Sequence, residues 1–489
     1  MSIPQYDLAI IGGGINGAGI AREAAGQGLS VFLCEKGDLA SATSSASSKL
    51  VHGGLRYLEY GEFRLVREAL AERETLLSIA PHIVWPLEFI LPHSRDTRPA
   101  WMIRFGLFLY DHLSARKKIA PSASVDFAKQ CNYRGMLNPA YKKGFRYTDC
   151  WVDDARLVVL NAVDAARHGA TIATRTACVK AEREDGHWRL DLQGEKNYSI
   201  HAKALINAAG PWLNEVIACT GIKTPHRVKR VKGSHIVVPK LHEGEQAYIL
   251  QMSDKRIVFV LPFERDFSLI GTTDMEYTGD PGKVAISPEE IRYLLGGVNR
   301  YVAVPVTEES IVWSYAGVRS LYDDASDNLS AMTRDYVLEL DTDGAPILTV
   351  FGGKITTYRR LAEQAIEKLA QPMEIVHKPW THTQPLPGGE KLKAELEREL
   401  AQTYPWLEES LKARWLRQYG TEIYTLLGDA SKISDLGQEI APQVYERELN
   451  YVKEQEWAMT GDDFLWRRTK LGLHLDANAT ASVHTWFGK

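Results

Sequence analysis

The sequence has no uninterrupted apolar run of 18 or more residues, so we expect no membrane-spanning helix. It has no excess of positive charge, and its formal net charge of −4 gives no global reason to bind nucleic acid. The N-terminus lacks a basic stretch before an apolar segment and leads directly into a predicted strand, so we expect no signal peptide.

Cysteine is also scarce, since the chain holds five cysteines and none of them forms a C-x-x-C pair. Their odd number and irregular spacing argue against a disulfide framework and against a zinc site, so we expect no metal. They fit a reducing compartment. Internal repeats and long low-complexity tracts are missing as well, and a length of 489 residues suggests about three domains.

The chain opens with a predicted strand, a glycine turn and a predicted helix. Residues 6–11 are apolar and predict a strand, and residues 18–26 predict a helix. Between them Gly12, Gly14 and Gly17 fill the G-x-G-x-x-G positions of a dinucleotide fold. The first glycine allows the turn, the second allows close approach to a pyrophosphate, and the third allows the helix to pack on the strand. The N-terminus of the helix then directs free N–H groups at the phosphates.

A carboxylate ends the next predicted strand, which covers residues 31–35. Glu35 lies about 20 residues beyond the glycines, where an acid binds the ribose 2′-hydroxyl. The same charge would repel a 2′-phosphate. The sequence therefore favours FAD or NAD over NADP.

Small hydroxylated residues dominate residues 40–48, directly after this first unit. A flexible linker has this composition. The position between a nucleotide fold and the segment 52–58 favours a ligand-binding segment instead, because small residues let the backbone approach phosphate or ribityl oxygens.

The remaining pattern mixes helices and strands, which predicts an α/β (α+β) chain. Residues 227–273 alternate as antiparallel strands do, and we expect them to form a mixed sheet over a substrate site. Residues 385–389 mark a boundary, after which only helices are predicted. The other expected elements are helices at 63–79, 100–113, 153–168 and 356–369, and strands at 170–181, 204–208 and 347–351.

The aromatic helix at residues 100–113 allows two interpretations. Apolar residues surround nearly the whole helix, which favours a core helix. Its basic flanks make an interfacial membrane surface the alternative. The cluster Arg467, Arg468 and Lys470 is a second candidate for that surface.

Several ordered motifs together resemble one family, the FAD-dependent respiratory glycerol-3-phosphate dehydrogenases in their bacterial aerobic form. The matching segments are residues 12–17, 43–58, 147–157, 232–235, 271–274, 317–319, 351–358 and 465–470. The resemblance spans essentially the whole chain. It implies a Rossmann-like FAD-binding domain of the amino-acid-oxidase-like flavoprotein type, a mixed-sheet substrate domain and a C-terminal helical domain.

We expect those domains to divide the chain as follows: the FAD-binding domain takes residues 1–80, 145–225 and 320–384, the substrate domain 81–144 and 226–319, and the helical domain 385–489. The resemblance further implies oxidation of sn-glycerol 3-phosphate to dihydroxyacetone phosphate, with electrons passed from FAD to ubiquinone or menaquinone. It also implies a cytoplasmic homodimer bound peripherally to the inner face of the cytoplasmic membrane.

Candidate residues follow from this chemistry. A substrate phosphate needs guanidinium groups, and Arg56 and Arg319 both lie in glycine-rich contexts. His52 and His235 are alternative proton acceptors. His52 has the better case, because it follows the hydroxylated segment that should run along the flavin, while His235 lies on a strand that should face the substrate. Tyr57 and Thr272 either position the substrate or only pack. Lys354 precedes a helix whose N-terminus stabilises the negative charge of a reduced flavin, and it is a candidate for catalysis, substrate binding and cofactor binding.

The cofactor contacts are expected at the glycine turn, the hydroxylated segment, the strand near Cys178 and the turn before residue 356. The candidates are Gly12, Gly14, Asn16, Gly17, Glu35, Thr43, Ser44, Ser45, Ser48, Lys49, Val179, Ala209, Gly210, Trp212, Gly353, Lys354, Ile355 and Thr356. Three other functions stay open: the same oxidation with oxygen as acceptor, an amine or amino-acid oxidase, and a non-catalytic flavin-binding protein.

Overall fold

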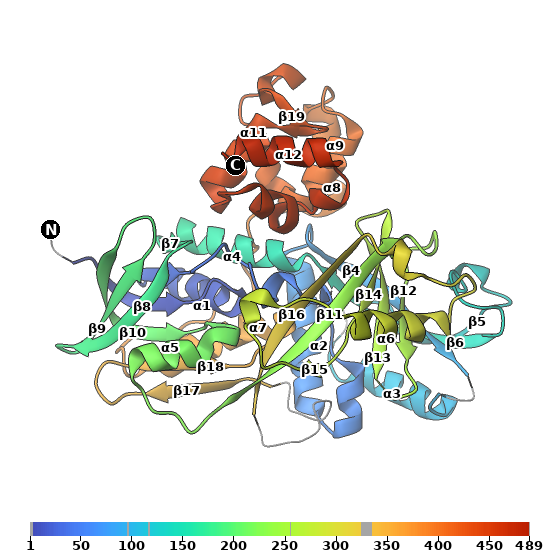
Figure 1. Ribbon diagram of the computed structural model, residues 1–489, viewed down its shortest axis with the longest axis horizontal. Helices are drawn as coiled ribbons and strands as arrows, with labels where there is room; N and C mark the ends of the chain where they lie inside the picture. Colours follow the sequence, from blue (N-terminus) through green and yellow to red (C-terminus); the bar gives the residue numbers. More distant parts are fainter. Residues whose placement is uncertain (1–2, 95–96, 116–117, 255, 324–334, 489) are drawn as a thin grey trace.

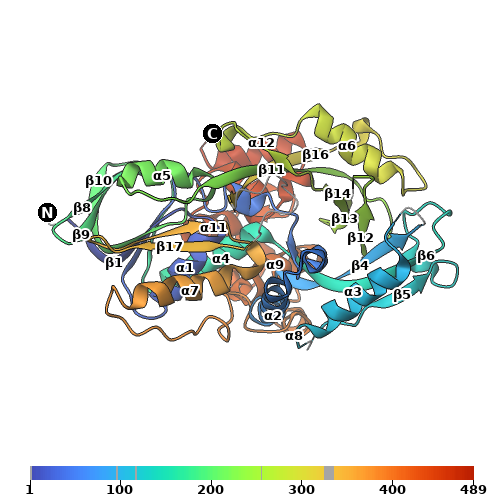
Figure 2. The ribbon, with the colours of Figure 1, turned by 90° about the horizontal axis from the view of Figure 1, so that it is seen from below.

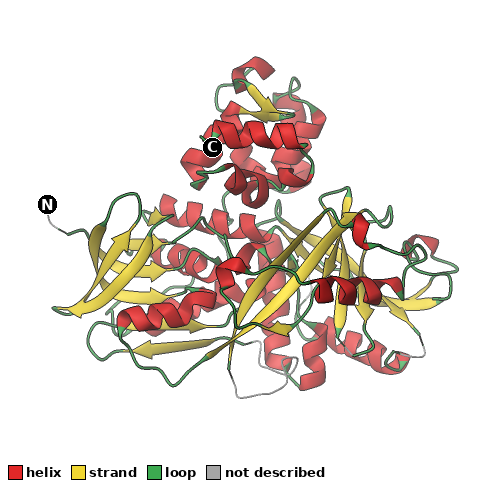
Figure 3. Cartoon of the chain, in the orientation of Figure 1, coloured by secondary structure: helices red, strands yellow, loops and turns green. Residues whose placement is uncertain are grey.

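The computed structural model describes residues 3–94, 97–115, 118–254, 256–323 and 335–488. Two sheets lie side by side, and a smaller C-terminal domain lies above the region where they meet (Figure 1). Figure 3 shows that helices pack around both sheets and dominate the C-terminal domain.

The first sheet is the nucleotide-binding one, with the strand order β17-β18-β10-β1-β2-β7 and with β9 and β8 added beside β10. Strands β18, β10, β1, β2 and β7 run parallel, so their carboxyl ends meet at one edge. The strands are β1 (Gln5–Ile11), β2 (Val31–Cys34), β7 (Thr171–Ala173), β8 (Ala177–Glu184), β9 (His187–Gln193), β10 (Tyr198–Asn207), β17 (Val337–Asp341) and β18 (Ile347–Phe351).

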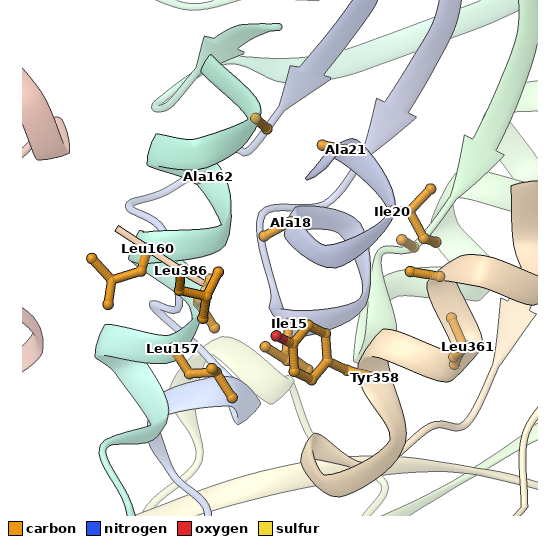
Figure 4. Packing of buried hydrophobic residues seen from close by; sticks show 14 of the residues in the cluster. Ile15, Ala18, Ile20, Ala21, Leu157, Leu160, Ala162, Tyr358, Leu361 and Leu386 are labelled. Atoms are coloured by element: carbon orange, nitrogen blue, oxygen red, sulfur yellow. The ribbon is translucent and has the colours of Figure 1, made fainter. Parts of the chain in front are cut away.

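Three helices cover one face of this sheet: α1 (Ile15–Ala25), α4 (Asp154–Arg167) and α7 (Tyr358–Ala370). Figure 4 shows α1 between the other two, with Ala18 and Ala21 turned towards α4 and Ile20 turned towards α7. The alanines allow α1 to approach α4 closely, and all three side chains are fully buried. The short helix α5 (Leu213–Thr220) packs on β8 and β10.

The second sheet has the order β15-β11-β14-β13-β12-β4-β6-β3, with β16 paired to β11 and β5 paired to β6. Its strands are β3 (Leu50–Val51), β4 (Val84–His93), β5 (Ala123–Asp126), β6 (Lys143–Val152), β11 (Val228–Pro239), β12 (Ala247–Gln251), β13 (Ile257–Phe263), β14 (Phe267–Gly271), β15 (Met275–Glu276) and β16 (Trp313–Tyr322).

Side chains alternate across the second sheet and form a separate core on each face. Val237 of β11 belongs to the core that also holds residues of α2 (Phe63–Ile79) and α3 (Ala100–His112). Its neighbours Ile236 and Val238 belong to the core beneath α6 (Pro288–Asn299). Figure 2 shows α3 and α6 on opposite sides of this sheet.

The C-terminal domain packs α8 (Lys393–Thr403), α9 (Glu409–Tyr419), α10 (Ile423–Leu427), α11 (Glu446–Glu456) and α12 (Ala477–Trp486) around its own core. It also contains a two-stranded sheet, β19 (Glu439–Ala441) and β20 (Val444–Tyr445), where only helices were predicted. Strands this short carry too little periodicity to be detected.

Buried charges join the C-terminal domain to the first domain. Arg468 binds Asp38, which follows β2, and Arg156 of α4 pairs with Glu456. Lys470 lies 3.5 Å from Asp153, the N-cap of α4. Arg468 and Lys470 are almost fully buried, so the prediction that this cluster faces a membrane is wrong.

Two other expectations need correction. The predicted strand 170–181 is two strands, β7 and β8, because the chain turns between them. β3 and most of β6 lie in the second sheet, although the predicted boundaries assign them to the FAD-binding domain. Their sequences suit a strand of either sheet, and only pairing partners distant in sequence decide between them.

Candidate functional site

A cavity of about 840 Å³ is lined by the carboxyl edge of the first sheet and by β11 and β16 of the second. This volume lies in the upper part of the range for cofactor and ligand sites. Of the candidate residues, those that line it are Gly12, Gly14, Asn16, Glu35, Thr43, Ser44, Ser48, His52, Tyr57, Ala209, Gly210, Trp212, His235, Thr272, Arg319, Gly353, Lys354, Ile355 and Thr356.

Gly12 and Gly17 of the glycine turn have no room for side chains. Gly12 has a φ of +117°, and a Cβ there would lie 2.5 Å from the carbonyl oxygen of Ala208. A Cβ on Gly17 would collide with the carbonyl of Gly12, so Gly17 does not face the cavity but lets α1 pack on the turn. Asn16 donates from Nδ2 to the carbonyl of Gly352 at 3.1 Å, which ties this turn to the one after β18.

Glu35 is held at the end of β2 by two backbone donors. The N–H groups of Gly13 and Gly37 donate to its two carboxylate oxygens at 2.8 Å each. Burial raises the pKa of this carboxyl, while the two hydrogen bonds oppose the rise. The carboxylate still lines the cavity, as a ribose acceptor must.

The hydroxylated segment runs along the cavity as expected, and Asp154 anchors it from behind. Asp154 accepts from Ser47 Oγ at 2.7 Å and pairs with Lys49 Nζ at 2.9 Å. Lys49 is therefore fully buried in an ion pair and does not line the cavity. Ser45 also turns away and donates to the carbonyl of Ala42.

The end of the cavity beside β2, β8 and α5 is lined by Cys34, Cys178 and Cys219. Val179, predicted to contact the cofactor, is about half exposed and lies outside the described lining, because successive strand residues face opposite sides. Lys36, which sequence analysis missed, stacks on Trp212 with Nζ 3.5 Å from the ring centroid. Burial lowers the pKa of Lys36.

The other end of the cavity gathers the candidate reacting groups. Arg319 on β16 pairs with Asp274, and Lys354 Nζ lies 4.0 Å from the Tyr57 ring centroid. Thr272 follows β14. The side chain of Arg56, the other predicted phosphate ligand, lies outside the described residues.

The two histidines differ in their surroundings. His235 Nε2 lies 2.9 Å from Ser48 Oγ, its ring stacks on Tyr315, and its buried Nδ1 has no partner among the described residues. Burial lowers the pKa of His235 well below its ordinary value. His52 lines the cavity, and its ring makes no hydrogen bond to the described part of the chain. Burial also lowers the pKa of His52, and Lys354 and Arg73 add to this effect against the attraction of Asp149.

The residues therefore fit FAD along the whole cavity. The turn after β18 holds Gly352 and Gly353 at φ of +78° and +103° and delivers the chain into α7. Thr356 Oγ1 accepts a hydrogen bond from the backbone N–H of His52 at 3.3 Å. This bond joins the turn before α7 to the segment that carries His52. Among the described residues no cluster of His, Cys, Asp and Glu suits a metal.

Comparison with known proteins agrees with this site. Residues 7–359 match the family model "FAD dependent oxidoreductase", and residues 379–485 match "C-terminal domain of alpha-glycerophosphate oxidase". The chain is 54% identical to a glycerol-3-phosphate dehydrogenase of Pseudomonas aeruginosa, over 96% of this chain and 92% of the relative. It is 51% identical to the aerobic glycerol-3-phosphate dehydrogenase of Escherichia coli and 50% identical to a D-erythritol 1-phosphate dehydrogenase of Brucella abortus, each over 98% of this chain and 97% of the relative.

Among solved structures, the chain is similar to a glycerol-3-phosphate dehydrogenase from Bacillus halodurans complexed with FAD. The TM-score is 0.77 at 26% identity, over 99% of this chain and 88% of the other. The predicted fold, with its FAD-binding domain, mixed sheet and mainly helical C-terminal domain, is confirmed.

Proposed function

Because the chain belongs to the family of FAD-dependent oxidoreductases, we propose that it oxidises sn-glycerol 3-phosphate to dihydroxyacetone phosphate, as a glycerol-3-phosphate dehydrogenase with FAD as its cofactor. One observation carries the proposal: Arg319, Lys354 and two histidines whose pKa values are lowered by burial line the same cavity as the glycine turn that fits a dinucleotide. Bound FAD supplies the acceptor for the hydride that leaves the substrate carbon.

The protein residues have separate tasks in this oxidation. Arg319 binds the phosphate, since its planar fork suits phosphate oxygens and Asp274 holds it on β16. His52 accepts the hydroxyl proton, because it lines the cavity and its ring makes no hydrogen bond to the described part of the chain, while His235 is engaged by Ser48. The N-terminus of α7 and Lys354 stabilise negative charge at the cofactor. His235 positions the hydroxylated segment through Ser48.

The flavin absorbance tests this function. We expect anaerobic sn-glycerol 3-phosphate to bleach it in one turnover and amino acids to leave it unchanged. D-erythritol 1-phosphate is the sharpest comparison, because a relative at 50% identity carries that name. Faster bleaching by the four-carbon phosphate would reassign the substrate, and no bleaching by either would leave a flavin-binding protein without this activity.

We also propose that electrons pass to ubiquinone or menaquinone at a bilayer, where a homodimer docks peripherally at the inner face of the cytoplasmic membrane. No helix in the described ranges is long and apolar enough to cross a bilayer. Helix α3 buries only Ile103, Leu107 and Tyr110, so the prediction of a core helix was wrong. Its other face is exposed and apolar, with Trp101, Met102, Phe105 and Phe108 between 44% and 70% accessible. Aromatic residues of this kind suit the interface of a bilayer.

Replacing this exposed face should release the protein from lipid. Trp101→Ser with Phe105→Ser removes two of the most exposed side chains, each worth about 1–3 kcal/mol when buried in the interface. We expect flotation with phosphatidylglycerol–phosphatidylethanolamine vesicles to fall at least about tenfold, while flavin bleaching by glycerol 3-phosphate stays normal.

The control is Val304→Ser with Val376→Ser, which removes apolar side chains that are 78% and 80% exposed elsewhere. It should float as the unaltered protein does. Equal flotation of both double variants would show that α3 does not dock.

Reduction of oxygen faster than of a soluble quinone would favour an oxidase over a dehydrogenase.

A further inference from the structure

A buried carboxylate lies behind the reacting end of the cavity without lining it. Glu290 is in the first turn of α6 and is 1% exposed. Helix α6 covers the face of the second sheet opposite α3. Sequence analysis missed Glu290, because S-P-E-E at 287–290 is a pattern typical of a helix start, and in the structure Ser287 and Glu290 do form a capping box.

Four donors converge on this carboxylate. Oε1 accepts from Ser234 Oγ at 2.8 Å and from Thr273 Oγ1 at 2.7 Å. Oε2 accepts from the backbone N–H of Ser287 at 2.9 Å and pairs with Lys232 Nζ at 2.7 Å. Burial raises the pKa of Glu290, but these hydrogen bonds outweigh burial and hold it below its ordinary value. The carboxylate is therefore ionised, and each of its two oxygens has two partners.

Two of these partners belong to the segments that carry reacting groups. On β11, Ser234 lies between Gly233 and His235, which both line the cavity. Thr273 lies between Thr272, which lines it, and Asp274, which holds Arg319.

The two segments are also joined directly. Ser234 donates its backbone N–H to Thr273 Oγ1 at 3.0 Å. Glu290 accepts hydrogen bonds from the side chains of both residues on the α6 side of the sheet. A single carboxylate thus spans both segments.

We propose that Glu290 is a positioning residue that fixes the register between the His235 segment and the Thr272–Asp274 segment, and so the place of Arg319 relative to the substrate. This inference rests on the proposed function. Glu290 touches neither substrate nor cofactor. Its loss therefore changes how the phosphate is held and leaves the FAD-binding turn unchanged.

Thr273 offers the mildest test, because Thr273→Val removes the hydroxyl and keeps the shape, whereas Thr273→Ser keeps the hydroxyl. We expect Thr273→Val to raise the apparent Kd of glycerol 3-phosphate in stopped-flow flavin reduction by about threefold to tenfold. Thr273→Ser should stay within about twofold of the unaltered protein. The FAD Kd and the resting absorbance spectrum should be unchanged in both.

Glu290→Gln should have the larger effect, at least about tenfold on the same apparent Kd, because the amide leaves Lys232 buried without its counter-charge. Adding Lys232→Met removes that unpaired ammonium and should recover part of the loss. The matched control is Glu448→Gln, another fully buried carboxylate, bound by Arg414 and Tyr419 in the C-terminal domain. It should lower the melting temperature without changing the substrate Kd.

Hydrogen exchange gives a readout that does not depend on the substrate. In the FAD-loaded protein, Glu290→Gln and Thr273→Val should speed amide exchange in residues 231–237 and 271–276 and leave residues 8–17 unchanged. Unaltered exchange and unaltered substrate Kd in both variants would overturn the proposal. So would equal effects of Glu448→Gln. Failure of glycerol 3-phosphate to bleach the unaltered protein would overturn the proposed function alone, and the exchange result would still decide the role of Glu290.

Discussion

Gly12→Ala should yield a folded protein that is purified without its yellow cofactor. The φ of +117° strains any side chain, at a cost of about 1–3 kcal/mol. The added Cβ would also lie 2.5 Å from the carbonyl oxygen of Ala208 and 2.8 Å from its carbonyl carbon. Both are backbone atoms of a segment that lines the same cavity, so relief of the collision must move one wall of the site. We expect FAD binding at least tenfold weaker, measured by titration of the apoprotein.

Gly28→Ala is the matched control. Gly28 has a φ of +86°, but its position is exposed and a Cβ there would meet nothing within 4 Å. This variant carries a similar backbone cost without a collision, so it should lose some thermal stability and keep FAD. Normal FAD affinity in Gly12→Ala would show that the turn does not hold the pyrophosphate, and the assignment of this cavity to FAD would fail.

His52→Ala should slow flavin reduction by about 10² to 10⁴ in the limiting rate, the usual contribution of a general base. The apparent Kd of glycerol 3-phosphate should change little, because Arg319, the proposed phosphate ligand, is unaltered. Stopped-flow absorbance over a range of substrate concentrations separates the two quantities.

The pH profile gives an independent check of this role. A base must be neutral, and the pKa of His52 lies below its ordinary 6.5. The limiting rate should therefore be constant above about pH 6.5 and be lost as the pH falls through the lower pKa. His52→Ala should lack this acid limb. His235→Gln should instead weaken FAD binding through Ser48. A hundredfold loss of rate in His235→Gln, with little loss in His52→Ala, would assign the proton to His235.

The first unit of the fold was predictable because its signals are local. Gly12 has a positive φ that the local turn requires, and Glu35 follows the glycines at a fixed distance. The ends of α2 at Phe63 and Ile79 also match the predicted helix, because its apolar spacing alone determines it.

Other features of the site depend on contacts between residues that are distant in sequence. Lys49 belongs to the hydroxylated segment, yet Asp154, 105 residues further on, draws it into a buried ion pair. Which face of α3 is exposed depends on how the helix packs against the second sheet. The helix sequence alone does not decide this, because apolar residues surround nearly the whole helix. Glu290 acquires its role only when β11 and the turn after β14 are neighbours.

The charges between the C-terminal domain and the first domain have a consequence for shortened variants. Asp38, three residues after Glu35, receives its buried partner Arg468 from the C-terminal domain. Arg156 of α4 likewise has its buried ion pair with Glu456 of the C-terminal domain. A variant shortened before residue 456 would therefore leave both Asp38 and Arg156 without these buried partners, and an unpaired buried charge is costly.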